Sequence, residues 1–164
     1  LGRIDILVNA ADVRLAKPIT EVSLAEWRQV NDANLTSTFL FCKAVAPVMA
    51  AQKQGSIVNV ASGLAARGVA NFGAYAASKG GVVSLTQSLA IELGAINIRV
   101  CCVAPGWYGP EVEVPGGRFA GWVPLRRLTR GEDIGALVAF LASDAAGYVS
   151  GHVHFVDGGT QIHP

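Results

Sequence analysis

The sequence lacks the features that mark several classes of protein. Three cysteines are an odd number, and because Cys101 and Cys102 are adjacent in an apolar run, we expect no disulfide framework and a cytoplasmic location. Charged residues make up only 15% and the formal net charge is +1, which gives no electrostatic reason to expect nucleic acid or an anionic membrane as a partner. No uninterrupted apolar run approaches a membrane span, and no cleavable signal segment opens the chain.

The chain is instead rich in apolar residues, 51% of 164, and these follow two periods. Short β-branched runs, typical of buried parallel strands, occupy residues 4–8, 56–60, 97–103 and 152–156. Helical stretches lie between them, at about residues 23–52, 72–93 and 132–143. A capping box formed by Ser23 and Glu26 opens the first of these helices. The alternation predicts one α/β domain, residues 1–164, with about four parallel strands and flanking helices.

Polar residues stand at the carboxyl ends of these strands, where parallel sheets bind their ligands. Asn9 follows the first strand, Ser62 follows the second, and Pro105 with Gly106 follows the third. Asn34 falls inside the first helix. We expect groups from these elements to converge on one rim of the sheet.

Tyr75 and Lys79 are four residues apart at the start of the second helix, in a segment of small residues, so they share one face. A neighbouring ammonium favours phenolate and lowers the pKa of a phenol from its usual value of about 10. Ser62 could hydrogen-bond the same substrate oxygen. These three groups suit the interconversion of a carbonyl and an alcohol, for which a cofactor must supply the hydride.

Over practically its whole length, the sequence resembles the short-chain dehydrogenases/reductases. "YAASK" (75–79) is similar to the family's Y-x-x-x-K, and Ser62 stands thirteen residues before the tyrosine, as the family's catalytic serine does. "NDANLTSTF" (31–39) resembles the segment with the catalytic asparagine, and "RVCCVAPGW" (99–107) resembles the strand and turn that meet the nicotinamide. Residues 132–159 are similar to the family's last helix and strand. The nearest subgroup looks like the 3-oxoacyl-carrier-protein reductases.

The resemblance implies a Rossmann-type fold and a function as an NAD- or NADP-dependent oxidoreductase of a small carbonyl or alcohol substrate. Tyr75 would be the general acid/base, Ser62 would polarise the carbonyl, Lys79 would also bind the nicotinamide ribose, and Asn34 would hold a water of the proton relay. The residues implied in cofactor contact are Asn9, Tyr75, Lys79, Pro105, Gly106 and Tyr108. The helices at 23–52 and 72–93 resemble those that form homo-oligomers, dimers or tetramers, in this family.

Three residues depart from the family pattern. "NAAD" (9–12) replaces N-N-A-G, so that Ala10 stands for an asparagine and Asp12 for a glycine. We expect Asp12 to narrow the cofactor groove or to conflict with the backbone angle that a glycine allows. Pro110 replaces a threonine that often binds the carboxamide, and proline has no N–H to donate.

The Gly-rich dinucleotide fingerprint does not occur in the sequence, which resembles the family from its fourth strand onward. We therefore expect a partial domain that lacks its first βαβ units, and with them the residues that distinguish NAD from NADP. Residues 4–8 would then form an open edge strand, and the chain by itself would associate, bind cofactor weakly and show almost no turnover.

Other interpretations of these residues remain open. Tyr75 and Lys79 could be a packing residue and a solvated cation, and Asn34 and Asn9 could bond only the backbone. Trp107, Phe119 and Trp122 line a substrate pocket or anchor a loop. His152 and His154 lack a third ligand, so no metal site is expected.

Two other classes of function were considered. A serine hydrolase with Ser62 as nucleophile lacks the first glycine of G-x-S-x-G. A non-catalytic fragment or oligomerisation scaffold is the more serious alternative.

Overall fold

A four-stranded parallel sheet forms the centre of the molecule. The computed structural model describes residues 2–108 and 121–162. Its strands are β1 (Ile6–Asn9), β2 (Gly55–Val60), β3 (Ile98–Pro105) and β4 (Val153–Val156), and they are hydrogen-bonded in that order. All three pairings are parallel, which confirms the predicted sheet. The strand boundaries differ slightly from the prediction. For example, β1 begins at Ile6 and not at residue 4.

Helices connect the strands as the sequence predicts. The longer helices in the described residues are α1 (Leu24–Asn31), α2 (Ser37–Gln52), α3 (Gly73–Gly94) and α5 (Gly131–Ala142). The described single turns of 3-10 helix are η1 (Ile19–Glu21), η3 (Gly63–Ala65), η5 (Asp144–Ala146) and η6 (Thr160–Ile162).

The first predicted helix contains a turn that the sequence did not indicate. Its capping box is confirmed, since the Ser23 hydroxyl accepts from the Glu26 N–H at 3.2 Å and the Glu26 carboxylate accepts from the Ser23 N–H at 2.8 Å. Between α1 and α2, however, lies a π-helical turn, η2 (Asp32–Thr36), with Asn34 at its middle. The wider turn changes the backbone pairing here, and the Thr38 hydroxyl donates to the Asn34 carbonyl at 2.8 Å.

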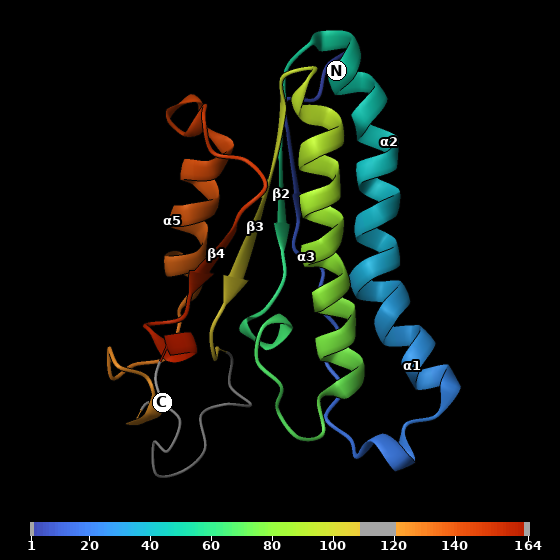
Figure 1. Ribbon diagram of the computed structural model, residues 1–164, viewed down its shortest axis with the longest axis vertical. Helices are drawn as coiled ribbons and strands as arrows, with labels where there is room; N and C mark the ends of the chain where they lie inside the picture. The colour runs from blue at the N-terminus through green and yellow to red at the C-terminus, as the bar shows by residue number, and fades with distance from the viewer. Residues whose placement is uncertain (1, 109–120, 163–164) are drawn as a thin grey trace.

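Helices cover both faces of the sheet, so the molecule has three layers. Figure 1 shows α2 and α3 on one face and α5 on the other. One group of buried side chains packs under α2 and α3: Cys42, Val45, Met49, Ile57, Leu93, Ile98 and Val100. A second group packs under α5: Val58, Cys101, Val103, Leu141 and Ala146. Successive residues of β2 and β3 therefore enter opposite cores, which explains why these strands are apolar throughout.

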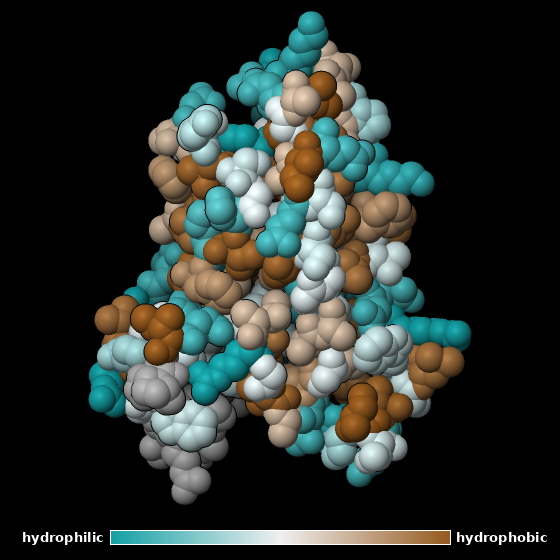
Figure 2. Space-filling model, viewed as in Figure 1, coloured by the Kyte–Doolittle hydropathy of each residue, from teal (hydrophilic) through white to brown (hydrophobic). Residues whose placement is uncertain are grey.

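Strand β1 lies at an edge of the described sheet, as the sequence analysis expected. Its side chains Ile6 and Val8 are 49% and 42% exposed, although both are apolar. Further apolar side chains are exposed at η1 and the start of α1, where Figure 2 shows brown atoms gathered at the lower right. These include Ile19, Leu24 and Trp27. Association of the chain through such surfaces stays a prediction.

One helical stretch qualifies by length and composition as a membrane span. Residues Leu24–Gln52 form 29 continuous helical residues with a mean hydropathy of 1.2 in the most apolar window, of which 28% is buried. No uninterrupted apolar run in the sequence is that long, because polar residues interrupt this stretch. In the fold, the side chains of Cys42, Val45 and Met49 on this stretch pack against the sheet, as in a core helix.

Candidate active site

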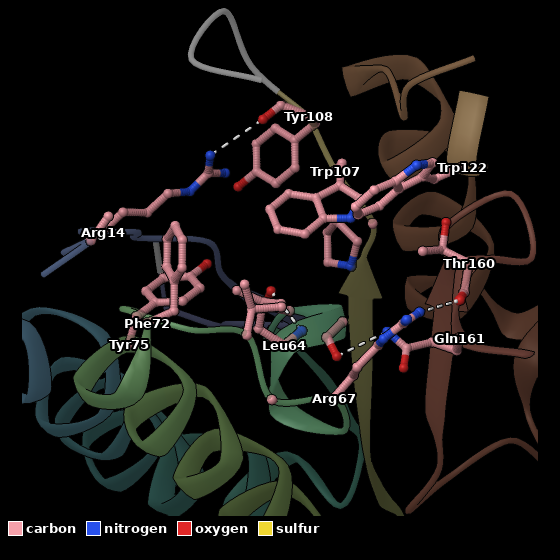
Figure 3. A pocket seen from close by; sticks show the side chains of 17 residues that line it. Arg14, Leu64, Arg67, Phe72, Tyr75, Trp107, Tyr108, Trp122, Thr160 and Gln161 are labelled. Atoms are coloured by element: carbon pink, nitrogen blue, oxygen red, sulfur yellow. Dashed lines mark hydrogen bonds between the residues drawn. The ribbon is translucent and has the colours of Figure 1, made fainter. Parts of the chain in front are cut away.

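A pocket of about 920 Å³ opens at the carboxyl ends of β2 and β3 (Figure 3). Five of the eight predicted site residues line it: Ser62, Tyr75, Pro105, Gly106 and Tyr108. They come from η3, α3 and the end of β3, so the fold brings together groups that the sequence separates widely. The other three, Asn9, Asn34 and Lys79, do not line this pocket.

Asp12 binds both members of the tyrosine–lysine pair. The Tyr75 hydroxyl donates to Asp12 Oδ1 at 2.9 Å, and Lys79 Nζ lies 3.0 Å from the same oxygen. The other carboxylate oxygen accepts from Arg14 Nε at 3.0 Å and from the Tyr108 hydroxyl at 3.3 Å. Asp12 is not among the residues with positive φ, so the loop after β1 accommodates it without the backbone conflict that we expected at a glycine position.

Lys79 is a buried cation whose partners all come from this chain. Its side chain is 1% exposed. Besides the Asp12 carboxylate, Nζ donates to the carbonyl of Val60 at 3.2 Å and to that of Ala11 at 3.4 Å. An ammonium has three N–H donors, so all three have acceptors in this arrangement. Lys79 lies 5.8 Å from the centre of the Tyr75 ring.

The protonation of Tyr75 differs from the sequence prediction. Burial raises the pKa of the Tyr75 phenol, and the Asp12 carboxylate raises it further by its charge and its hydrogen bond, although Ser62 lowers it. The predicted lowering of this pKa by Lys79 is therefore wrong for this structure, because Asp12 neutralises that lysine. Burial would raise the pKa of Asp12 as well, but Lys79, Tyr75 and Arg14 hold it below its usual value. At neutral pH Asp12 is thus an anion and Tyr75 a neutral phenol.

Ser62 follows β2 and begins η3. Its Oγ accepts from the Leu64 N–H at 3.2 Å, which satisfies the start of this short helix. A serine hydroxyl that accepts one bond still has its own proton to donate. Ser62 lines the pocket together with Tyr75, whose pKa it lowers by a hydrogen bond.

The two predicted asparagines bond to the protein itself. Asn34 accepts from the Val13 N–H at 2.8 Å through Oδ1, and its amide nitrogen donates to the Val13 carbonyl at 2.9 Å and to Ser78 Oγ at 3.0 Å. It thereby fixes the loop that carries Asp12. Asn9 donates to Asn59 Oδ1 at 2.8 Å and lines a smaller hollow of about 180 Å³ beside β1.

The far wall of the pocket requires a glycine. A Cβ on Gly106 would lie 2.7 Å from the Cα of Asp157, a distance that side chains do not tolerate. Tyr108 follows this turn, and the Arg14 guanidinium lies 4.3 Å from the centre of its ring. Pro110 and Phe119 lie outside the described residues.

Several lining residues were missed or left undecided in the sequence analysis. Trp107 and Trp122 do line the pocket, which favours the first of their two interpretations. Asp12 stood out only as a departure from a family motif. Arg14 and Arg67 gave no signal, since a single arginine in a loop has no spacing that marks it.

Comparisons with known proteins identify the family of this chain. A family model described as Enoyl-(Acyl carrier protein) reductase matches residues 1–161. The chain is 42% identical to cis-4-hydroxycyclohexanecarboxylate dehydrogenase from Sinomonas cyclohexanicum, over 96% of this chain and 66% of that protein. It is 36% identical to 5-keto-D-gluconate 5-reductase from Escherichia coli strain K12, over 99% of this chain and 66% of that protein.

A solved structure of an oxidoreductase of the short chain dehydrogenase/reductase family, from Burkholderia thailandensis, matches with a TM-score of 0.90 and 34% identity. The chain belongs to the short-chain dehydrogenase/reductase family. The resemblance seen in the sequence is thereby confirmed, as is the Rossmann-type α/β fold. The chain spans 66% of the length of the two relatives named above and 64% of the matching structure.

In this short-chain dehydrogenase/reductase, replacing Asp12 with Asn should lower the pKa of Tyr75 by about 1–3 units, because an anion beside the phenol disfavours phenolate. With Tyr75 as the proton donor that the sequence predicts, the loss of carbonyl reduction at alkaline pH should begin at a lower pH in the variant. The pH dependence of kcat/KM for reduction measures this shift.

The same change at the exposed Asp144 is the matched control, since this residue lies beyond α5 and outside the pocket lining. Asp144→Asn should leave the profile unchanged. An Asp12→Asn profile identical to that of the unaltered protein would contradict the influence of Asp12 on Tyr75.

Proposed function

We propose that this protein interconverts a carbonyl and a secondary alcohol by hydride transfer, with NAD or NADP as cofactor. The observation that carries the proposal is that Tyr75 and Ser62 line one pocket together with Pro105 and Gly106. Two hydroxyls that share a pocket can bind one substrate oxygen, one as proton donor and one as polarising donor. Relatives that are named as dehydrogenases and reductases support this choice.

The residues that line the pocket are compatible with a bound nicotinamide. Gly106, which packs against Asp157 too closely for a side chain, and Tyr108 line the pocket with Tyr75. The residues that we propose for cofactor contact are Asn9, Tyr75, Lys79, Pro105, Gly106 and Tyr108. When bound, the nicotinamide supplies or accepts the hydride.

The proton chemistry belongs to the chain. Tyr75 gives its phenol proton to the carbonyl oxygen in reduction and takes a proton from the alcohol in oxidation, and Ser62 donates to the same oxygen. Lys79 pairs with the Asp12 carboxylate beside the phenol and is proposed to bind the nicotinamide ribose. Asn34 is proposed to hold a water of the proton relay from the π-helical turn.

The serine hydrolase alternative finds no support at this site. No histidine is among the described residues that line the pocket, so Ser62 has no base beside it. A non-catalytic scaffold remains the competing function. We also propose one Rossmann-type domain that acts as a homo-oligomer in the cytoplasm on a small-molecule substrate.

Titration of the purified complete gene product with NADH and NADPH, followed by nicotinamide fluorescence, tests the proposal. We expect saturable binding of at least one of them, and oxidation of the bound form when a cyclic ketone or a β-keto ester is added. Absence of binding for both would overturn the proposal and favour the scaffold.

A further inference from the structure

The pocket of this protein is positively charged among its described residues. Of the 17 residues that line it, two are arginines, Arg14 and Arg67, and none is an aspartate or glutamate. Arg14 is already paired with Asp12 at 3.0 Å. Arg67 forms no ion pair within the described residues, so its charge is not balanced there. A single net cation inside a pocket attracts an anionic ligand.

The Arg67 side chain is held by a hydrogen bond to the backbone and has further N–H donors. Nη1 donates to the Thr160 carbonyl at 3.0 Å, and the neighbouring Gln161 donates to the Gly63 carbonyl at 2.9 Å. A guanidinium has five N–H donors, and one bond to a neutral carbonyl uses only one of them. Figure 3 shows Arg67 beside Gln161, on the side of the pocket away from Arg14. The side chain is thus positioned by η6 without being neutralised.

The wall around this cation is mainly apolar. Leu64, Val69, Phe72, Trp107 and Trp122 all line the same pocket. Such a wall favours a hydrocarbon body over a hydroxylated one, because it offers few partners to hydroxyl groups. Ser62 and Arg67 stand on either side of η3, and both line this pocket.

We propose that the substrate carries a carboxylate on an apolar body, and that Arg67 binds that carboxylate. The inference rests on the proposed function in one respect, namely that Tyr75 and Ser62 take the reacting oxygen at the other end of the ligand. Two parallel N–H···O bonds match a guanidinium to a carboxylate, and no other described residue of the pocket offers a cation without a carboxylate partner. Arg67 is then the residue that determines specificity for acids.

Two indoles in the pocket wall, Trp107 and Trp122, allow a test that needs neither cofactor nor turnover. Tryptophan fluorescence of the complete gene product is followed while cyclohexanecarboxylate, or its neutral isostere cyclohexanecarboxamide, is added. We expect the acid to bind about tenfold more tightly than the amide, because charge-assisted hydrogen bonds are the stronger ones. Arg67→Gln should remove this preference, and Arg67→Lys should retain part of it.

Arg126→Gln is the matched control. Arg126 is exposed, lies outside the described pocket lining and also donates one bond to a backbone carbonyl, that of Gly121. It should keep the preference for the acid. Equal binding of acid and amide by the unaltered protein, no response to either probe, or a preference that survives Arg67→Gln would each overturn the inference.

The anion on Arg67 could also come from a phosphate of the cofactor. Titration of Arg67→Gln with NADPH and NADH separates the two sources. We expect affinities within about twofold of the unaltered protein, since a cation that is not engaged by the cofactor contributes little to its binding. A large loss of cofactor affinity would overturn the carboxylate inference but leave the proposed function standing.

Discussion

Replacing Tyr75 with Phe is expected to lower the rate of carbonyl reduction by about 10³-fold, while the protein stays folded and still binds cofactor. General acid catalysis by a positioned group contributes about 10²–10⁴-fold, and Phe has no proton to give. The ring itself is retained, together with its edge-on contact with Phe72 at 6.3 Å between centroids. Asp12 keeps Lys79, Arg14 and Tyr108 as partners. Steady-state kinetics and NADPH or NADH titration measure the two effects separately.

Tyr108→Phe is the matched comparison for this variant. It removes a second phenol that lines the pocket and donates to Asp12, at 3.3 Å, without removing the proposed acid/base. Its effect on the rate should be far smaller than that of Tyr75→Phe. If the two variants lost activity equally, the loss would reflect the hydrogen bonds to Asp12, and Tyr75 would not be the proton donor.

Lys79→Met is expected to reduce the rate, the cofactor affinity and the stability together. The substitution leaves the Asp12 carboxylate with Arg14 but without the second of its two cations at 3.0 Å, and it removes the Lys79 donor from two carbonyls. Breaking a fully buried ion pair costs about 3–5 kcal/mol, and because the Asp12 side chain is 19% exposed we expect about 2 kcal/mol here. Denaturant unfolding measures the stability, and NADH or NADPH titration the affinity.

A double variant, Lys79→Met with Asp12→Asn, tests the cause of that loss. The carboxylate that loses one of its two cations in Lys79→Met is absent from the double variant, so the double variant should be more stable than Lys79→Met alone. An additive loss of stability would show that Lys79 acts on the fold independently of Asp12.

The order of secondary structure could be predicted because its causes are local. The β-branched runs of β2 and β3 and the capping box at Ser23 depend on neighbours within a few residues. The π-helical turn at Asn34 was not predictable in this way, since hydrogen bonds from Asn34 to Val13 and to Ser78 on α3 accompany it. Burial of both sheet faces could be predicted from composition, because a strand that is apolar throughout must be covered by other elements on both faces of the sheet.

By itself, the sequence determined the family and the parallel sheet, and it singled out Ser62, Tyr75 and Lys79 as the candidate groups for the chemistry. Each of these rests on spacing along the chain. The tertiary structure alone decided the protonation of Tyr75, because the loop after β1 brings Asp12 to Tyr75 across 63 residues. It also placed Arg67 in the pocket wall. Charges act through space and through local desolvation, and neither distance nor burial can be read from sequence separation.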